Sequence, residues 1–213
     1  MEEMITRIII VRHGESRGNL ENRFRGRMDY ELNETGLKQA GELAKALSSL
    51  APEVIYSSPL KRALQTAEPI ARDTGLPVIQ KNGFNNISLG YWEGRLKKEI
   101  AKEYPEKWDL WLTNPEKLEI EGGESFASVQ KRAFSALEEI VEENRGKTLM
   151  TVSHRTTIKP LIAACIGIKE PYFWKIHVDT ASYSIIHHSS KRGYCLFSLN
   201  FTDHLSKLNI EWN

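Results

Sequence analysis

The sequence predicts an α/β fold, a three-layer α/β/α sandwich around a mostly parallel central sheet. Short apolar runs alternate with segments of helical periodicity along the 213 residues, as expected when helices cover both faces of a sheet. The runs at 6–11 and 148–152 are mostly apolar, which is typical of strands buried on both faces. With 40% hydrophobic and 27% charged residues, the chain suits a single globular domain over residues 1–213.

In the first half of the chain, the pattern predicts strands at 6–11, 54–56 and 77–79, separated by two helices. The apolar residues of the first helix recur at helical spacing behind Thr35, the expected N-cap; they are Leu37, Ala40, Ala44, Leu47 and Leu50. Ser58 and Pro59 are expected to open the second helix. Proline has no backbone N–H, and N–H groups in the first helical turn have no intrahelical partner, so a proline costs nothing there.

The second half begins with a mixed pattern at 96–124, predicted to be a mostly helical excursion that caps the sheet and could act as a lid. Within it, Trp108 and Trp111 are expected to cover the core rather than to stack on a substrate. Ser125 is the predicted cap of a helix over 126–144, and Gly167 closes a helix over 158–166. The runs at 182–187 and 194–199 predict a terminal antiparallel pair.

Charge and composition exclude several classes of partner. The 29 basic and 28 acidic residues give a net charge of +1, so no global field favours nucleic acid or a membrane surface. The acidic start at 1–4 lacks the features of a signal peptide, and no segment is long enough to span a bilayer. Cys165 and Cys195 are far apart and fit ordinary thiols of a reducing compartment, so we expect a cytoplasmic protein. A homodimer is compatible with the sequence, which leaves the oligomeric state open.

Two predicted strands each end in a histidine. Residues 8–11 lead into Arg12-His13-Gly14-Glu15-Ser16, and residues 149–152 lead into Ser153-His154-Arg155. Ligands of open parallel sheets bind in the crevice at the carboxyl ends of the strands. We therefore expect both imidazoles to share one site.

The first of these motifs, followed by Asn19, resembles the signature of the histidine phosphatase superfamily, the phosphoglycerate mutase-like enzymes. The resemblance continues in order through Arg25-Gly26, Leu32, Thr35-Gly36, Ser57-Ser58-Pro59, Arg62, Gln65-Thr66-Ala67, Gly90, Trp92-Glu93-Gly94, Gly122-Gly123-Glu124-Ser125 and Ser153-His154. The stretch 181–184 is also similar to metal-independent phosphoserine phosphatases. The resemblance implies a phosphoglycerate mutase-like sandwich and a phosphatase that needs no cofactor and acts on a small phosphorylated metabolite.

The residue types fit phosphoryl transfer, which needs a nucleophile and neutralisation of the phosphoryl oxygens. A neutral His13 could form a phosphohistidine that water later cleaves. Arg12 and Arg62 offer planar donor forks, and His154 adds a donor if it is protonated. No metal is implied, because the histidines lack metal-ligand spacing with carboxylate or thiolate partners.

Further residues are candidates for substrate binding. By resemblance, Asn19 and the backbone at Arg25 and Gly26 would complete the phosphate cradle. Ser16 could touch phosphate, although a local hydrogen bond in its turn explains it equally well. Arg155 stands where relatives usually have glycine, and it could bind a carboxylate or second phosphate or be a solvated residue at a helix start. The other histidines, His177, His187, His188 and His204, are expected to be structural or solvated.

One departure from the family pattern concerns the acid. Relatives that cleave unactivated esters carry a glutamate four residues before the glycine at Gly90, and this position is Asn86 here. No Asp or Glu occurs anywhere from Thr74 to Trp92. A carboxamide forms hydrogen bonds but cannot deliver a proton at neutral pH.

Three explanations follow for Asn86. Another acid could substitute, with Glu93 and Asp179 as candidates by motif. The protein could turn over slowly, or only on esters with activated leaving groups. Alternatively, it could bind phosphorylated ligands as a catalytically weak regulatory protein. A phosphoglycerate mutase is a less favoured alternative, because the segment 84–87 lacks the basic character of mutases.

Overall fold

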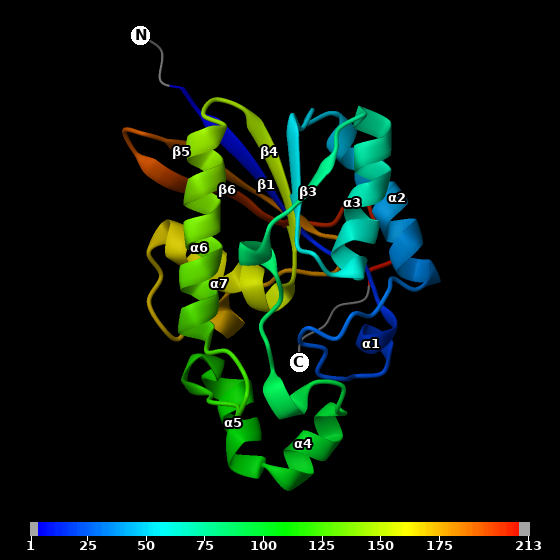
Figure 1. The fold of residues 1–213 in the computed structure, drawn as a ribbon, viewed down its shortest axis with the longest axis vertical. Coiled ribbons are helices and arrows are strands. Elements are labelled where there is room, and N and C mark those ends of the chain that lie inside the picture. The colour runs from blue at the N-terminus through cyan, green and yellow to red at the C-terminus, as the bar shows by residue number, and fades with distance from the viewer. Residues whose placement is uncertain (1–3, 209–213) are drawn as a thin grey trace.

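A six-stranded sheet in the order β3-β2-β4-β1-β5-β6 forms the centre of the computed structural model, which describes residues 4–208 (Figure 1). The strands are β1 (Thr6–Arg12), β2 (Val54–Ser57), β3 (Val78–Gln80), β4 (Thr148–Ser153), β5 (Tyr183–Ser189) and β6 (Gly193–Phe201). Parallel pairing joins β1 to β4, β4 to β2 and β2 to β3, whereas β5 runs antiparallel to β1 and to β6. The predicted mostly parallel sheet and its terminal antiparallel pair are confirmed. The first three residues of the acidic start lie outside the described residues.

Helices cover both faces of this sheet, as Figure 1 shows. Because side chains alternate along β1, Ile8 and Ile10 join one core cluster and Ile9 and Val11 join another. The first cluster includes apolar residues of α6 (Phe126–Glu143) and α7 (Arg155–Ile166), and the second those of α2 (Glu34–Ser48) and α3 (Lys61–Thr74). The predicted three-layer sandwich is confirmed.

Three predicted helix starts are wrong by a few residues. Asn33, not Thr35, is the N-cap of α2, because its side chain accepts a 2.8 Å hydrogen bond from the backbone N–H of Gly36. Leu37, in the first turn, is 53% exposed rather than part of the core.

The next helix, α3, begins at Lys61, after Pro59 rather than at it. The backbone N–H of Lys61 donates to the Asp29 carboxylate at 2.7 Å, so a side chain from a distant loop caps this helix. The Ser125 cap of α6 and the left-handed Gly167 at the end of α7 are as predicted, but α7 begins at Arg155, three residues before the predicted start at 158.

The excursion between the two halves of the sheet is mostly helical, as predicted. It contains α4 (Lys97–Glu103), α5 (Pro105–Thr113) and the short turn Pro115–Lys117. In Figure 1, α4 and α5 lie at the end of the molecule where α1 (Arg17–Leu20) follows β1. Trp111 is 2% exposed, and its ring centroid lies 5.1 Å from that of Phe24, so it covers the core as expected.

The register of the sheet decides where the two histidines emerge. Arg12 of β1 lies opposite Ser153 of β4 in a parallel pair. His13 and His154 therefore leave the sheet side by side, at the carboxyl ends of adjacent strands. Within residues 4–208, no helix combines the length and apolar character needed to cross a bilayer.

Candidate active site

The structure brings the two strand-end histidines together. The backbone N–H of His13 donates to the carbonyl oxygen of Ser153 at 3.0 Å, directly before His154. The two imidazole centroids are 5.1 Å apart with their planes inclined by 56°. Both side chains are almost completely buried, at 2% and 1% exposure. The pairing expected from the strand ends is thus present.

Local hydrogen bonding selects the tautomer of His13. Its Nδ1 lies 2.7 Å from the carbonyl oxygen of Gly14, and since a carbonyl can only accept, Nδ1 carries the proton. Burial, and then the positive charges of Arg62 and Arg12, hold the pKa of His13 well below its ordinary value. At neutral pH the imidazole is therefore uncharged and has its lone pair on Nε2, as a nucleophile requires.

The His154 side chain is also neutral at pH 7. Burial and the charge of Arg62 keep the pKa of His154 well below its ordinary value. Its Nε2 lies 2.7 Å from Ser58 Oγ, whereas its Nδ1 is buried and has no hydrogen-bond partner within residues 4–208. The sequence predicts His154 as a hydrogen-bond donor to the ligand in its protonated form. Because its pKa is lowered, the ring would be protonated only with a bound anion beside it.

The start of α7 also favours an anion. His154 is the N-cap of this helix and forms no side-chain capping bond there.

The guanidinium groups of the two predicted arginines, Arg62 and Arg12, donate hydrogen bonds to backbone carbonyl oxygens. Arg62 is completely buried and donates to the carbonyl oxygens of Met28 at 2.8 Å and Gly26 at 2.9 Å. Burial and the neighbouring Arg25 lower the pKa of Arg62 to about 9, so it stays protonated at pH 7. Arg12 donates to the carbonyl oxygen of Val178 at 2.9 Å. The two guanidinium groups are thus fixed before any ligand arrives.

A cavity at the strand ends collects seven of the predicted site residues. These are Arg12, His13, Arg25, Gly26, Asn86, His154 and Arg155. The remaining lining residues, which the sequence interpretation missed, are Arg23, Phe24, Leu89, Lys97, Trp111 and Thr156. The lining contains four arginines and one lysine but, within the described part of the chain, no carboxylate. Such a cavity favours a ligand with strong negative charge.

Three of the missed residues have a sequence signal. Arg23 and Phe24 directly precede Arg25, and Thr156 directly follows Arg155, so all three lie beside predicted positions. The others reach the cavity from segments whose tertiary position the sequence does not fix. Between residues 4 and 208, no group of three or more His, Cys, Asp or Glu side chains is placed to hold a metal ion.

Three predicted residues do not line the cavity. Ser16 and Asn19 bond to each other: the Ser16 backbone N–H and hydroxyl donate to Asn19 Oδ1 at 3.0 and 2.6 Å. For Ser16, this is the local hydrogen bond weighed from the sequence. Arg62 lies behind the cavity wall, through its bonds to the segment that carries Gly26.

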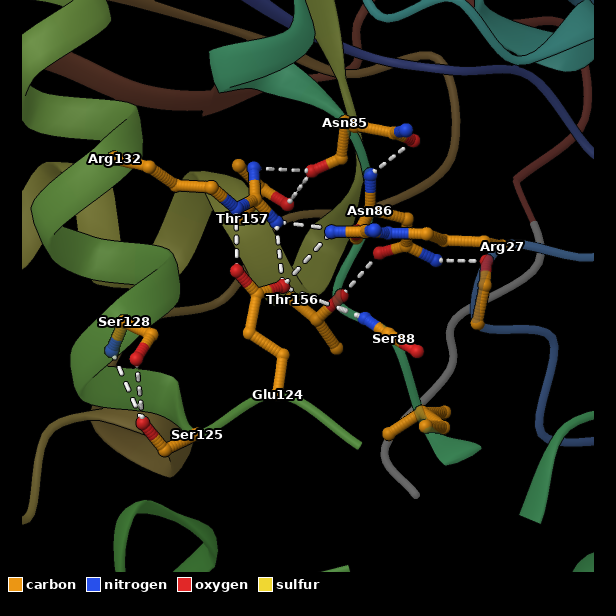
Figure 2. A network of polar contacts seen from close by, with 12 residues as sticks. Arg27, Asn85, Asn86, Ser88, Glu124, Ser125, Ser128, Arg132, Thr156 and Thr157 are labelled. Atoms are coloured by element: carbon orange, nitrogen blue, oxygen red, sulfur yellow. Dashed lines mark hydrogen bonds and ion pairs between the residues drawn. The ribbon is translucent and has the colours of Figure 1, made fainter. Parts of the chain in front are cut away.

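Asn86 is held by a network that extends well beyond the cavity (Figure 2). Its Nδ2 donates to the carbonyl oxygen of Gly26 at 2.7 Å, and its Oδ1 accepts from the Thr156 hydroxyl. Arg132 of α6 donates to the carbonyl oxygens of Asn85 and Asn86, at 2.8 and 3.1 Å, and to Glu124. The amide is thus fixed in the wall of the cavity.

Neither substitute acid proposed from the motifs lines the cavity. Glu93 accepts backbone N–H groups of Arg27 and Leu89 at 3.0 and 2.9 Å, as a structural carboxylate does. Asp179 lies 2.9 Å from both His177 Nε2 and Asn200 Nδ2. The geometry therefore does not support either side chain as a replacement for the missing acid.

Comparison with known proteins gives a consistent result. A model of the histidine phosphatase superfamily, branch 1, matches residues 8–200. Phosphoserine phosphatase 1 of Hydrogenobacter thermophilus is 40% identical over 207 residues, covering 97% of this chain and 98% of the relative. The solved structure of Bacillus stearothermophilus YhfR has a TM-score of 0.90 and 31% identity, covering 94% of this chain and 100% of that chain. A mutant phosphoserine phosphatase from Entamoeba histolytica, solved in complex with phosphoserine, has a TM-score of 0.83 and 30% identity, with coverage of 94% and 99%.

Proposed function

Because the chain belongs to the histidine phosphatase superfamily, branch 1, we propose that it hydrolyses a small phosphorylated metabolite through a phosphohistidine at His13. The observation that carries this proposal is the neutral His13 imidazole, whose Nδ1 proton is held by Gly14 and whose Nε2 is left for attack. We further propose that residues 1–213 act as one catalytic domain, with the 96–124 excursion as its cap.

The proposed reaction has two steps. In the first, His13 Nε2 attacks phosphorus, a P–N bond forms, and the bond from phosphorus to the ester oxygen breaks. We propose that Arg12 and His154, which line the cavity, stabilise the charge on the phosphoryl oxygens, and that Arg62 supports this charge from behind the cavity wall. In the second step, water attacks phosphorus and loses a proton to solvent, the P–N bond breaks with its electron pair returning to His13 Nε2, and inorganic phosphate leaves.

The leaving oxygen needs a proton in the first step, and this requirement limits the substrate. Asn86 occupies the position of the usual acid, and its amide is committed to the Gly26 carbonyl. An alkoxide would therefore have to take its proton from solvent. A phenolate leaves without such help, so aryl phosphates should be the better substrates.

Phosphate release from an aryl phosphate tests the proposal. We expect the natural chain to release phosphate and to carry an acid-labile phosphoryl group on His13 after rapid quenching, detected by mass spectrometry. His13→Ala should lose both signals, whereas His187→Ala, altered on β5 outside the cavity, should keep them. Equal turnover by the natural chain and His13→Ala would refute the proposal.

A second function is favoured by the cavity lining, which is cationic and contains no carboxylate among the described residues. Such a site could bind phosphorylated ligands without meaningful turnover. In that case the natural chain would bind inorganic phosphate or vanadate in calorimetry, yet release no phosphate from an aryl ester. The same assay therefore separates the enzyme from a binding protein.

A further inference from the structure

The turn that leads into β5, residues 178–182, is hydrogen-bonded to the end of β1. The Arg12 guanidinium donates to the carbonyl oxygen of Val178 at 2.9 Å. The backbone N–H of Ala181 donates to the carbonyl oxygen of His13 at 3.1 Å. The 178–182 turn therefore contacts both the arginine and the histidine that the proposed reaction places at the phosphoryl group.

The conformation of this turn needs support from its surroundings. Ala181 is completely buried and has a φ of 54°, in the left-handed region. A residue with a Cβ atom seldom adopts this region and keeps it only where neighbouring groups fix it. One such group is His204, whose Nε2 lies 3.0 Å from the carbonyl oxygen of Ala181.

Asp179 and Asn200 form a second support, because they are hydrogen-bonded to each other twice. The backbone N–H of Asp179 donates to Asn200 Oδ1 at 2.7 Å, and Asn200 Nδ2 donates to Asp179 Oδ2 at 2.9 Å. The other carboxylate oxygen of Asp179 lies 2.9 Å from His177 Nε2. Hydrogen bonds are directional, so two bonds between the same residues fix the orientation of Asp179 as well as its position.

Asn200 is itself held near the end of β6. Its φ of 57° is left-handed, a conformation that asparagine adopts more readily than most residues. Its backbone N–H donates to Ser184 Oγ at 3.0 Å. Ser184 belongs to the stretch 181–184, which has no part in the proposed reaction. The pair of Asp179 and Asn200 thus connects β6 to the 178–182 turn.

A single peptide group links this pair to Arg12. The carbonyl of Val178 and the N–H of Asp179 belong to the same peptide group, which is planar and rigid. Its oxygen accepts from the Arg12 guanidinium, and its N–H donates to Asn200. The bond to Asn200 therefore sets the direction in which the Val178 carbonyl points. Such an anchor matters, because misplacing a catalytic group by about 1 Å can cost about 10²-fold in rate.

We propose that Asp179 and Asn200 are positioning residues, which act through the peptide group between Val178 and Asp179 to hold the Arg12 guanidinium in the direction that a bound phosphoryl group requires. Asp179 is 3% exposed and does not line the cavity, so it acts on the ligand only through Arg12. The proposal rests on the proposed function for placing the phosphoryl group at Arg12 and His13.

Two variants break the pair from opposite sides. Asp179→Ala removes the carboxylate, and Asn200→Gly removes the amide while leaving a residue that adopts a φ of 57° without strain. Asp179→Asn is the conservative variant, because its side-chain oxygen can still accept from Asn200 Nδ2.

Asn144→Ala is the matched control. Asn144 is 8% exposed, and its Nδ2 donates to the Tyr56 hydroxyl at 3.1 Å and to the carbonyl oxygen of Ile140 at 2.9 Å. It precedes β4, at the opposite end of that strand from His154. Its change therefore also removes two buried hydrogen bonds, but far from the cavity. Urea denaturation gives the stability of each variant, and all binding is measured on folded protein.

The first measurement is the dissociation constant of inorganic phosphate by calorimetry. Asp179→Ala and Asn200→Gly should each weaken binding by about tenfold or more, because hydrogen bonds from a charged donor to the anion are lost or lengthened. Asp179→Asn should recover most of this affinity, and Asn144→Ala should leave it unchanged. The double variant of Asp179→Ala with Asn200→Gly should lose less than the product of the two single losses, because both changes break the same pairing.

The second measurement needs no ligand. The Nε of Arg12 is buried, so its N–H should exchange slowly with solvent, as seen by NMR of protein with isotope-labelled arginine. Asp179→Ala and Asn200→Gly should accelerate this exchange more than Asn144→Ala does at a similar loss of stability.

Unchanged phosphate affinity in both pair variants would overturn the proposal. Weaker phosphate binding with unchanged Arg12 exchange would also overturn it, because the effect would then not pass through Arg12. If the natural chain binds no phosphate at all, the phosphate site of the proposed function is overturned, while the exchange of Arg12 still decides whether the pair positions this side chain.

Discussion

The side-chain amide of Asn86 donates a 2.7 Å hydrogen bond to the backbone carbonyl oxygen of Gly26. The Oδ1 of Asn86 accepts a hydrogen bond from the Thr156 hydroxyl. The side chain therefore lies between an acceptor, the Gly26 carbonyl, and a donor, the Thr156 hydroxyl. An amide matches both neighbours. An ionised carboxylate would place two acceptors together at Gly26, whereas a protonated carboxyl group would satisfy both.

This arrangement predicts a strong dependence on the leaving group. The natural chain should hydrolyse para-nitrophenyl phosphate faster than phosphoserine or propyl phosphate by about 10²-fold or more, because general acid catalysis typically contributes about 10²- to 10⁴-fold. Initial rates of phosphate release at pH 7 for the three esters give the ratio. Similar rates on aryl and alkyl esters would show that another group protonates the leaving oxygen.

Restoring a carboxyl group should remove much of that dependence. Asn86→Glu provides the acid that the family resemblance implies at this position, and Asn86→Asp keeps the shape of the present side chain. With the Gly26 carbonyl as neighbour, the protonated form is favoured and the pKa of the new acid should rise.

The expected result is a gain of about tenfold or more on propyl phosphate, with little change on the aryl ester. Asn85→Asp is the matched control, because Asn85 neighbours the site and its Oδ1 accepts from the Asn86 backbone N–H. A gain shared by Asn85→Asp would point to a general effect of charge.

The buried histidines should titrate at unusually low pH. Burial and the nearby arginines lower the pKa values of both His13 and His154, so the neutral forms persist below pH 6.5. NMR titration of labelled histidine side chains should show both rings still neutral where an exposed imidazole is half protonated. Addition of vanadate should raise the pKa of His154, since a neighbouring anion favours its charged form. Two histidines that titrate near 6.5 without ligand would contradict the described electrostatics.

The sequence was informative where local signals coincide with a general rule of sheet topology. The apolar runs before His13 and His154, together with the rule for strand ends, were sufficient to predict one shared site. The start of α2 was harder, because Asn33 and Thr35 are both good caps and only the bond to Gly36 decides between them.

Long-range contacts could not be predicted in this way. Arg132 reaches the Asn86 segment across 46 residues of sequence, and its spacing carries no periodic signal. Trp111 and Lys97 reach the cavity from the excursion, whose place over the strand ends depends on tertiary packing. For Arg155, the sequence favoured substrate binding and a solvated side chain equally. Its burial against the Trp174 ring, seen only in the structure, argues against the solvated side chain.

The contacts of Arg132 predict that this residue supports the Asn86 segment. It binds both oxygens of Glu124, at 2.7 and 3.0 Å, and three backbone carbonyls of the segment at 83–86 (Figure 2). Arg132→Met should lower the free energy of unfolding by about 2 kcal/mol, because buried acceptors lose their donors. Urea denaturation measures the change, and Lys131→Met, exposed on the same helix, is the control. A stability equal to that of the control would show that the network is not structural.

The final prediction concerns Lys159, whose buried amine should destabilise the fold in a pH-dependent way. Burial first, and then Arg155 and Arg12, lower the pKa of Lys159 to about 6, against the opposing effects of Asp179 and Glu116. In the unfolded chain its pKa is near the ordinary value of 10.5. Between about pH 6 and 10.5, the unfolded state binds more protons at this group, so its destabilising effect weakens as pH rises.

Lys159→Met removes the amine but keeps a long apolar side chain. It should raise the free energy of unfolding by about 1–3 kcal/mol near pH 6 and by less at pH 9. The gain is smaller at pH 9 because the lysine of the natural chain is then neutral in the folded state and destabilises the fold less. Urea denaturation at pH 6, 7.5 and 9 measures the trend, with the exposed Lys102→Met as control. A gain that grows with pH, or a loss of stability at pH 6, would mean that Lys159 is stabilised as a cation by a contact stronger than those to Phe173 and Trp174.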